Sequence, residues 1–343
     1  MGVGPSGPTS RSAGGGAAVH RETTAARPVL KWAGGKSQLL ETFLHCYPAG
    51  LSTGGIRRYM EPFVGSGAVL FDVAARFLLD EYVIVDRNPH LIRTYQVIRD
   101  QAPALIERLS AWQELYWSMG SRDREGFYYA IRDRFNAGQD PPLDEAVALI
   151  FLNRTCFNGL YRVNRQGRFN VPIGRYDRPL ICDAANLLRV QQVFRQVDIR
   201  CGTPEDVLDR VDADTFVYCD PPYRPLTATS SFTAYSEDGF GDEEQVALAR
   251  FVKACDERGA AVMLSNADPH NIDPADNFFD DLYRGFVITR VPARRSINAQ
   301  RSRRGPVMEL VITNYPVTLP GPAPSTAPQS SSEGSRSRTG ARV

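Results

Sequence analysis

The chain has 343 residues, of which 43% are hydrophobic and 23% charged, and its formal net charge at pH 7 is +1. This length accommodates a large core or one domain that carries an insertion, and the composition is ordinary for a globular protein. No uncharged apolar stretch is long enough to span a membrane, and the six cysteines and four histidines form neither a C-x-x-C pair nor a ligand cluster, which argues against a zinc site or a disulfide framework.

The two ends of the chain are predicted to be disordered tails. Residues 1–27 are rich in Gly, Ser, Thr and Ala, and residues 318–343 are rich first in Pro and Ser and then in Arg. Neither segment has enough large apolar side chains to form a core. The first tail also lacks the apolar segment of a signal peptide, so we expect a cytoplasmic location.

The first motif is Leu30-Lys-Trp-Ala-Gly-Gly-Lys-Ser37. Its two glycines permit a ligand to approach the backbone closely. Trp32 offers a face for stacking, and Lys36 offers a partner for a carboxylate. The four-residue gap of a phosphate-binding P-loop is absent. A ligand-contacting turn and a simple helix-entry turn are both open readings of this segment.

A strand, a glycine turn and a helix come next. Residues 58–63 are predicted to form a strand, Gly65 and Gly67 lie in the turn, and residues 68–79 read as a helix. The third glycine of a dinucleotide fingerprint is replaced by Leu70. Since that glycine helps to seat a pyrophosphate on the helix N-terminus, its absence favours a cofactor without phosphates.

The next predicted strand, 82–85, ends at Asp86. This acid follows Gly65 by 21 residues, close to the offset at which an acid accepts hydrogen bonds from ribose hydroxyls. Residues 89–98 then read as a helix. Together these elements predict a nucleoside cofactor bound by a doubly wound α/β sheet.

The segment 101–190 differs in character from its flanks. It contains three helical stretches, at 102–117, 124–135 and 143–153, followed by a loop-rich region. From Arg154 to Arg178 the sequence has six arginines and one acid. Such a basic patch on a nearly neutral protein suggests a local track for a polyanion, although a solvated loop is the alternative.

Strands alternate with helices again after residue 190. Further strands are predicted at 197–200, 214–219, 260–265, 285–290 and 308–314. We therefore predict one α/β catalytic domain, formed by residues 28–100 and 191–317, that is interrupted by a mostly helical insert at 101–190. A second arginine-rich segment, 290–304, follows the sixth predicted strand.

Asp220-Pro-Pro-Tyr223, which follows the predicted strand 214–219, carries the most chemical information. Pro221 has no backbone N–H, and the ring of Pro222 restricts the residue before it to extended conformations. This rigid elbow presents the Asp220 carboxylate, the Pro221 carbonyl and the Tyr223 ring together. Two acceptors and a stacking face suit an exocyclic amine on a flat ring. The alternative is an ordinary strand-to-loop turn with an acidic end.

Together and in this order, the motifs resemble the Dam-type DNA adenine-N6 methyltransferases (D12 class, α group). The cofactor turn precedes the insert, and the insert precedes Asp220, as in the α group. The matching segments are Leu30–Lys36, Glu61–Gly67, Asp86–Asn88, Asn153–Arg162, Phe169–Tyr176, Tyr218–Tyr223, Phe232–Tyr235, Leu264–Asn266, Arg295–Asn298 and Glu309–Tyr315.

The resemblance implies a Rossmann-like methyltransferase fold with S-adenosylmethionine as the cofactor, in agreement with a nucleoside that carries no phosphate. The insert would be the target-recognition domain. The implied catalytic residues are Asp220, Pro221, Pro222 and Tyr223. The implied cofactor-binding residues are Trp32, Lys36, Phe63, Gly65, Gly67, Asp86 and Asp220.

The resemblance also implies double-stranded DNA as the substrate, with GATC as the leading site and the target adenine flipped out of the duplex. Phe157 and Asn158 look like the residues that fill the space left by the base. Family members often have Tyr at the position of Phe157, so here the stacking face is kept and the hydroxyl is lost. The implied DNA-binding residues are Arg154, Phe157, Asn158, Arg162, Asn164, Asn170, Pro172, Arg175, Tyr176, Arg295 and Ser296.

Two other classes of function are consistent with some of these features. An amine methyltransferase that acts on cytosine N4 or on RNA adenine would use similar chemistry, but the former more often begins the motif with Ser and the latter usually lacks so large an insert. A DNA-binding regulator with a decayed active site is opposed by the intact Asp86, Asp220 and Tyr223. We expect no metal, and a restriction endonuclease that acts on the same site is a candidate partner.

Overall fold

The computed structural model describes residues 25–224, 240–293 and 307–319, and the structural statements below concern these residues. Most of both predicted tails lies outside the described residues, as do the motif Phe232–Tyr235 and the predicted DNA contacts Arg295 and Ser296. Arg27 lies at the end of the first predicted tail and is described. Its backbone N–H and carbonyl form hydrogen bonds of 3.0 and 2.9 Å with the side chain of Asn186.

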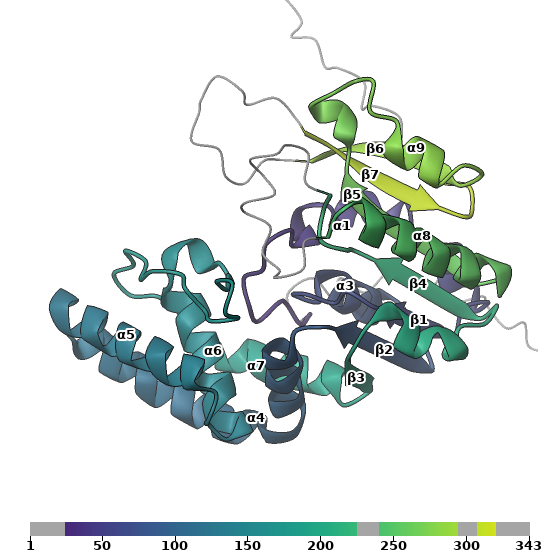
Figure 1. Ribbon diagram of the computed structural model, residues 1–343. Coiled ribbons are helices and arrows are strands. Elements are labelled where there is room, and N and C mark those ends of the chain that lie inside the picture. The colour runs from purple at the N-terminus through teal and green to yellow at the C-terminus, as the bar shows by residue number, and fades with distance from the viewer. Residues whose placement is uncertain (1–24, 225–239, 294–306, 320–343) are drawn as a thin grey trace, which may run out of the picture.

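A seven-stranded sheet forms the centre of the molecule (Figure 1). The strand order is β3-β2-β1-β4-β5-β7-β6, in which β7 runs antiparallel to both neighbours and the other pairings are parallel. This order confirms the predicted α/β class with a doubly wound, Rossmann-like sheet. The strands are β1 (Arg58–Glu61), β2 (Glu81–Asp86), β3 (Val197–Cys201), β4 (Thr215–Cys219), β5 (Ala261–Ala267), β6 (Val287–Ala293) and β7 (Val307–Thr313).

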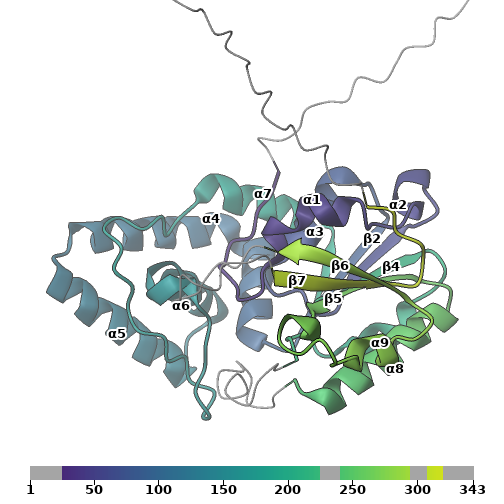
Figure 2. The ribbon, with the colours of Figure 1, turned by 90° about the horizontal axis from the view of Figure 1, so that it is seen from above.

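Alternate side chains of the central strands pack on opposite faces of the sheet. In β4, Phe216 and Tyr218 join the apolar cluster on one face, and Val217 and Cys219 join the cluster on the other. All five residues of β4 are buried because helices cover both faces. Figure 2 shows the two helical layers with the sheet between them. The first layer contains α1 (Leu40–Leu44), α2 (Gly50–Thr53), α3 (Ala68–Arg76) and α7 (Ala184–Phe194), and the second contains α8 (Asp242–Glu257) and α9 (Phe278–Leu282).

Between β2 and β3 the chain forms a helical lobe that lies beside the sheet (Figure 1). The lobe is built from α4 (Pro89–Ser118), α5 (Ser121–Ala137) and α6 (Pro142–Thr155), and α6 packs against both other helices. After the loop that follows α6, α7 packs on α4 and returns the chain to β3. The three helices predicted for this region are therefore present, whereas the sequence analysis does not predict α7 or α8.

Helix α4 joins two helices that the sequence analysis separates, and it bends between them. Gln101 has non-helical angles (φ −133°, ψ 26°), and Pro103 follows two residues later. Proline lacks the N–H of the helical ladder and clashes with the preceding turn, which accounts for the bend. The predicted boundary between residues 100 and 101 falls at this bend, and the boundary between 190 and 191 falls inside α7. The division into a catalytic and a recognition domain remains a prediction.

Candidate active site

The carboxyl ends of β1 and β4 form the centre of the candidate active site. These strands are neighbours at the point where the strand order reverses, because β2 and β3 lie beyond β1 and β5 lies beyond β4. Open α/β sheets bind their ligands in the crevice at this switch point. Glu61 ends β1 and Asp220 directly follows β4, so both carboxyl groups come from this edge of the sheet.

The Asp220 carboxylate is held through one of its two oxygens. The Lys36 ammonium lies 2.8 Å from Oδ1, and the Ser265 hydroxyl donates to the same atom at 2.9 Å. The Tyr218 hydroxyl lies 2.9 Å from the Ser265 hydroxyl, and this hydrogen bond fixes the position of Ser265. Burial raises the pKa of the Asp220 carboxyl, while Lys36 and Ser265 act in the opposite direction. Among the described residues no hydrogen bond reaches Oδ2, so this oxygen is available to a ligand.

The proline elbow is held from α8. The fully buried Gln245 donates to the Pro222 carbonyl at 3.3 Å, and its own amide oxygen accepts from Asn266 at 3.2 Å. Within the described part of the chain, no hydrogen bond reaches the Pro221 carbonyl. One carbonyl of the elbow is thus committed to the fold, and the other is available.

Arg224 anchors the residues that follow the elbow. Its guanidinium donates to both oxygens of Asp242, at 2.6 and 3.2 Å, and to Asp276 at 2.6 Å. It also lies 4.3 Å from the centre of the Phe278 ring. A planar fork on a carboxylate fixes direction as well as distance. Gln245 therefore holds Asp220-Pro-Pro-Tyr223 at Pro222, and Arg224 holds the chain directly after it.

The Tyr223 ring is restrained at its face and at its tip. The Lys36 ammonium lies 4.7 Å from the ring centre, and the Tyr223 hydroxyl donates to Glu309 Oε2 at 2.7 Å. Burial raises the pKa of the Glu309 carboxyl, and the Lys36 charge and the Tyr223 hydrogen bond lower it. The sequence analysis assigns Glu309 no role, although an acid inside the otherwise apolar run Val307–Thr313 is the kind of signal that marks a buried polar contact.

The glycine turn is bonded directly to Asp86. One oxygen of this carboxylate accepts from the Gly65 N–H at 3.0 Å, and the other accepts from the Asn88 N–H at 2.9 Å. Gly65 and Gly67 have positive φ angles of 45° and 71°, which other residues rarely adopt. Burial raises the pKa of the Asp86 carboxyl, and the two N–H groups oppose this rise. Asp86 therefore lies at the end of β2 with one oxygen bonded to the glycine turn and the other to the backbone that follows β2.

The N-terminus of α3 is occupied by a carboxyl group of the protein itself. Glu61, 2% exposed, accepts hydrogen bonds from the Leu70 N–H at 3.1 Å and from the Tyr59 hydroxyl at 2.9 Å. Burial raises the pKa of Glu61 well above its usual range. A helix N-terminus is where nucleotide-binding sheets seat a phosphate. Glu61 takes one of those N–H donors and leaves this helix end poorly suited to a phosphate.

Trp32 covers the glycine turn. A side-chain carbon at Gly65 would lie 3.0 Å from Trp32 Cδ1, so the indole needs glycine at this position. The indole stacks on Tyr161, with ring centres 5.0 Å apart and planes at 17°. Phe63 lies at the start of the same turn, and its ring meets Phe240 edge-on at 5.9 Å.

Asn153 links the first motif to the helical lobe. This buried side chain accepts from the Lys31 N–H at 2.8 Å, donates to the Lys31 carbonyl at 2.9 Å and donates to the Gly159 carbonyl at 3.1 Å. Gly159 packs so closely on Lys31 that an added side-chain carbon would lie 2.2 Å from its Cδ. The segment before Trp32 and the turn after α6 are thus joined by one residue.

The predicted DNA wedge is at an exposed tip. Phe157 is 52% exposed, and its N–H bonds to the Pro172 carbonyl at 2.9 Å. Asn158 is the single non-glycine residue with positive φ (57°) in the part of the chain that the structure describes. A strained residue at an exposed tip is typical of a functional loop.

Other predicted DNA readers bond within the protein. Arg162 donates to the Asn170 amide oxygen at 2.7 Å, and Asn164 caps its own hairpin by accepting from the N–H groups of Gln166 and Arg168 at 2.9 and 3.1 Å. The Arg154 guanidinium points inward to the Val29 carbonyl, and burial lowers the pKa of Arg154.

The last group of predicted DNA readers lies on residues 172–176. Pro172 and Arg175 are exposed, and the Tyr176 ring is partly buried with the Lys31 ammonium 5.2 Å from its centre. The predicted catalytic and cofactor residues thus meet at the switch point. The described DNA readers lie on the loop between α6 and α7, except Arg154, which lies in the last turn of α6.

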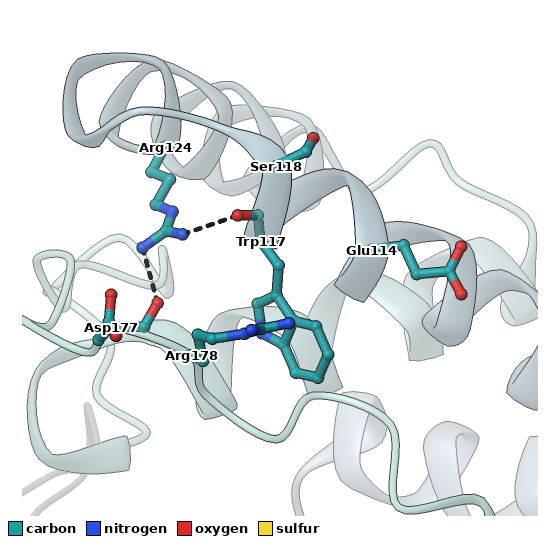
Figure 3. A pocket seen from close by; sticks show the side chains of 6 residues that line it. All are labelled: Glu114, Trp117, Ser118, Arg124, Asp177 and Arg178. Atoms are coloured by element: carbon teal, nitrogen blue, oxygen red, sulfur yellow. Dashed lines mark hydrogen bonds between the residues drawn. The ribbon is translucent and has the colours of Figure 1, made fainter.

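A hollow opens elsewhere in the lobe, between the end of α4 and residues 177–178 (Figure 3). Arg124 donates to the carbonyls of Tyr116, Trp117 and Asp177 at 2.9, 3.1 and 2.7 Å. The first two carbonyls belong to the last turn of α4. Carbonyls in the last turn of a helix have no N–H partner within the helix, so Arg124 supplies one. None of the predicted site residues lines the hollow, whose walls are Glu114, Trp117, Ser118, Arg124, Asp177 and Arg178.

No helix of the described residues is both long and apolar enough to cross a membrane. No group of three or more His, Cys, Asp and Glu side chains in the same ranges is arranged to hold a metal ion.

Comparison with known proteins gives one consistent result. A family model described as D12 class N6 adenine-specific DNA methyltransferase matches residues 32–297. The Type II methyltransferase M.MjaIII of Methanocaldococcus jannaschii is 44% identical over 292 residues, which cover 84% of this chain and 99% of that protein. The Type II methyltransferase M1.LlaDCHI of Lactococcus lactis subsp. cremoris is 35% identical over 296 residues (84% and 95%). The DNA adenine methylase of Escherichia coli K12 is 34% identical over 290 residues (84% and 96%).

Proposed function

The chain belongs to the D12 class of N6 adenine-specific DNA methyltransferases, and on this premise we propose that it methylates a flipped adenine within GATC in double-stranded DNA, with S-adenosylmethionine as the cofactor. The observation that carries the proposal is the asymmetric use of the Asp220 carboxylate, in which Lys36 and Ser265 occupy only Oδ1.

Two features of the glycine turn support S-adenosylmethionine. Glu61 accepts the Leu70 N–H at the start of α3, so a pyrophosphate there would lose that donor. Asp86 ends β2 beside Gly65, where a carboxylate can accept from ribose hydroxyls. When bound, S-adenosylmethionine supplies an activated methyl group on a positively charged sulfonium. Trp32, Phe63 and the two glycines of the turn would contribute the remaining walls of the pocket.

Asp220 and Pro221 act on the adenine amine. Asp220 Oδ2 accepts one N–H, and the Pro221 carbonyl accepts the other. These bonds favour a more tetrahedral nitrogen, whose lone pair is less delocalised into the ring and therefore more nucleophilic. Asp220, whose pKa is raised by burial, is suited to take the proton that the nitrogen loses on methylation. Tyr223 stacks on the base, and positioning of this kind can contribute roughly 7–11 kcal/mol to catalysis.

Phe157 and Asn158 compensate for the extruded base. Unpairing and unstacking one nucleotide costs a few kcal/mol. A planar side chain that enters the gap offsets part of this cost by stacking on the neighbouring bases. The exposure of Phe157 and the positive φ of Asn158 support this role.

The loop between α6 and α7 is the proposed reader of the site. Arg175 and Arg162 are both exposed, and Asn170 accepts a hydrogen bond from Arg162, so either arginine can pair with guanine. Asn164 and Arg154 would contribute by shaping the loop, since both bond inside the protein. Pro172, Tyr176, Arg295 and Ser296 complete the proposed contact set.

A labelling experiment tests the function. Purified protein is incubated with methyl-labelled S-adenosylmethionine and duplexes that contain GATC, GATT or no adenine. We expect N6-methyladenine in GATC only. Equal labelling of GATC and GATT would overturn the proposed site, and absence of labelling in every duplex and in genomic DNA would overturn the function. Asp220→Ala should bind the duplex without transferring methyl groups.

The names of the relatives suggest a partner. Since Type II methyltransferases are among them, we include a restriction endonuclease of the same specificity as a proposed partner. A nuclease from the source organism that cuts unmodified GATC duplex but spares duplex modified by this protein would support it. Cleavage of both duplexes alike would contradict it.

A further inference from the structure

We propose that Glu309 is a positioning residue for methyl transfer and that it acts through the hydroxyl group of Tyr223. This inference rests on the proposed function, because it concerns how the stacking ring of that site is held. Glu309 contributes no atom to the reaction itself.

The backbone of Glu309 is one of the best-fixed positions near the site. Strand β7 lies between β5 and β6, and Glu309 pairs with Ala267 on one side and with Val291 on the other. Because β7 is antiparallel, its first residues lie beside the last residues of β5, at the edge where the carboxyl ends of the parallel strands meet. The backbone at Glu309 is therefore held by strands on both sides, at the edge of the sheet where the site lies.

Tyr223, in contrast, belongs to no strand and lies in the segment that follows β4. Its ring can stack on a base only in one orientation, and the structure supplies two restraints on it. Lys36 contacts the face of the ring at 4.7 Å, and Glu309 binds the hydroxyl at 2.7 Å. The first restraint depends on a side chain that also holds Asp220, whereas the second depends on the sheet alone. Catalytic groups need such second supports, because a displacement of about 1 Å can cost on the order of 100-fold in rate.

The chemistry of Glu309 indicates that it is kept for function. The three residues after it, Leu310, Val311 and Ile312, are buried in the apolar clusters, and an acid beside them loses hydration. An apolar residue would serve the sheet better. Among the described residues, the Tyr223 hydrogen bond and the nearby Lys36 charge compensate for the lost hydration, and both of these groups belong to the site.

A double-mutant cycle on turnover tests the inference. We expect Tyr223→Phe and Glu309→Leu each to lower kcat by about 10- to 100-fold, while KM for the cofactor and for the duplex changes by less than about 3-fold. The double variant should be no slower than the slower single variant, because both changes remove the same restraint. Glu309→Gln, which keeps an acceptor oxygen, should recover most of the turnover. Glu257→Leu, a matched change on the exposed end of α8, should have no effect.

Several outcomes would overturn the inference. Wild-type turnover in Tyr223→Phe or in Glu309→Leu would do so, as would losses that multiply in the double variant. If Glu309→Leu does not fold, Tyr223→Phe still decides the question, since it removes one oxygen atom and leaves the ring. Asp220→Ala is measured alongside. If it is inactive while Tyr223→Phe is fully active, only the role of Glu309 fails; if it is active, the proposed mechanism fails.

Discussion

The ammonium group of Lys36 lies 2.8 Å from Asp220 Oδ1 and 4.7 Å from the centre of the Tyr223 ring. One buried cation, 4% exposed, thus contacts both the acceptor and the stacking face of the proposed base pocket. Its third contact, to the Gly34 carbonyl at 2.6 Å, ties it to its own turn. The first motif therefore reaches directly into the proposed reaction site.

Replacing Lys36 should change the pH dependence of catalysis. Burial raises the pKa of Asp220 and Lys36 lowers it, so Lys36→Met should raise this pKa further. The carboxylate form is lost as the pH falls through the pKa, and the acid limb of kcat/KM should therefore move to higher pH. A pH profile of kcat/KM measures this shift, with Lys253→Met on the surface of α8 as the control. An unmoved limb in Lys36→Met would contradict the assignment of Asp220 as the titrating group.

Glu61→Gln should make the stability of the protein less dependent on pH. Because burial raises the folded-state pKa of Glu61, the folded protein holds a proton that the unfolded chain releases above about pH 4.3. The contribution of Glu61 to stability is fully present below that pH and falls as the pH rises toward the folded-state pKa. The melting temperature of Glu61→Gln relative to the wild type should therefore increase from pH 5 to pH 8. A constant difference across this range would show that the pKa of Glu61 is not raised in the folded protein.

Phe157→Ala should lower kcat/KM by about 10- to 100-fold on a fully paired duplex, because the wedge offsets part of an extrusion cost of a few kcal/mol. The loss should shrink when the target adenine is mismatched, since a mismatched base costs less to extrude. Phe157→Tyr, which restores the residue common in the family, should behave as the wild type does. An equal loss on paired and mismatched duplexes would assign Phe157 to binding and not to extrusion.

Arg124→Lys should loosen the segment that follows Arg175. Lysine keeps the charge but cannot bridge the carbonyls of Tyr116, Trp117 and Asp177 at once, and the loss should be about 1–3 kcal/mol of unfolding free energy. If the segment reads DNA, KM for the duplex should rise while kcat at saturating duplex is retained. Denaturant unfolding and steady-state kinetics measure the two effects, with the exposed Arg122→Lys on the same helix as the control.

Local patterns predicted the parts of the site that depend on neighbouring residues. Asp220-Pro-Pro-Tyr223 and the pair Gly65 and Asp86 are recognisable because a turn and its ligand groups lie together in the chain. The partner expected for Lys36 is a carboxylate, and the ion pair with Asp220 agrees with this. All seven predicted strands are present. The apolar runs of the central strands β1, β2, β4 and β5 are easy to recognise because these strands are buried on both faces of the sheet.

Contacts between distant segments were missed for a physical reason. Gln245 meets the elbow from α8, and Glu309 meets it from β7, which pairs with β5. The local sequence around these two residues does not indicate either contact. Helix α8 (Asp242–Glu257) is also absent from the helices predicted from the sequence, although Asp242 and Glu244 lie in its first turn. Acidic residues in such a cluster are typical of the first turn of a helix. Here the Glu244 side chain accepts a hydrogen bond of 2.8 Å from the Gly241 N–H, directly before the start of α8.

The position of β7 has a consequence for biosynthesis. Among the strands of the described residues, β7 is the last to leave the ribosome, yet it lies between β5 and β6, which do not pair with each other. A nascent chain that ends after β6 lacks the strand that joins these two and the acid that meets the tyrosine. Polypeptides truncated before Val307 would thus lack an assembled reaction centre, and methylation of the genome would begin only with chains that include β7.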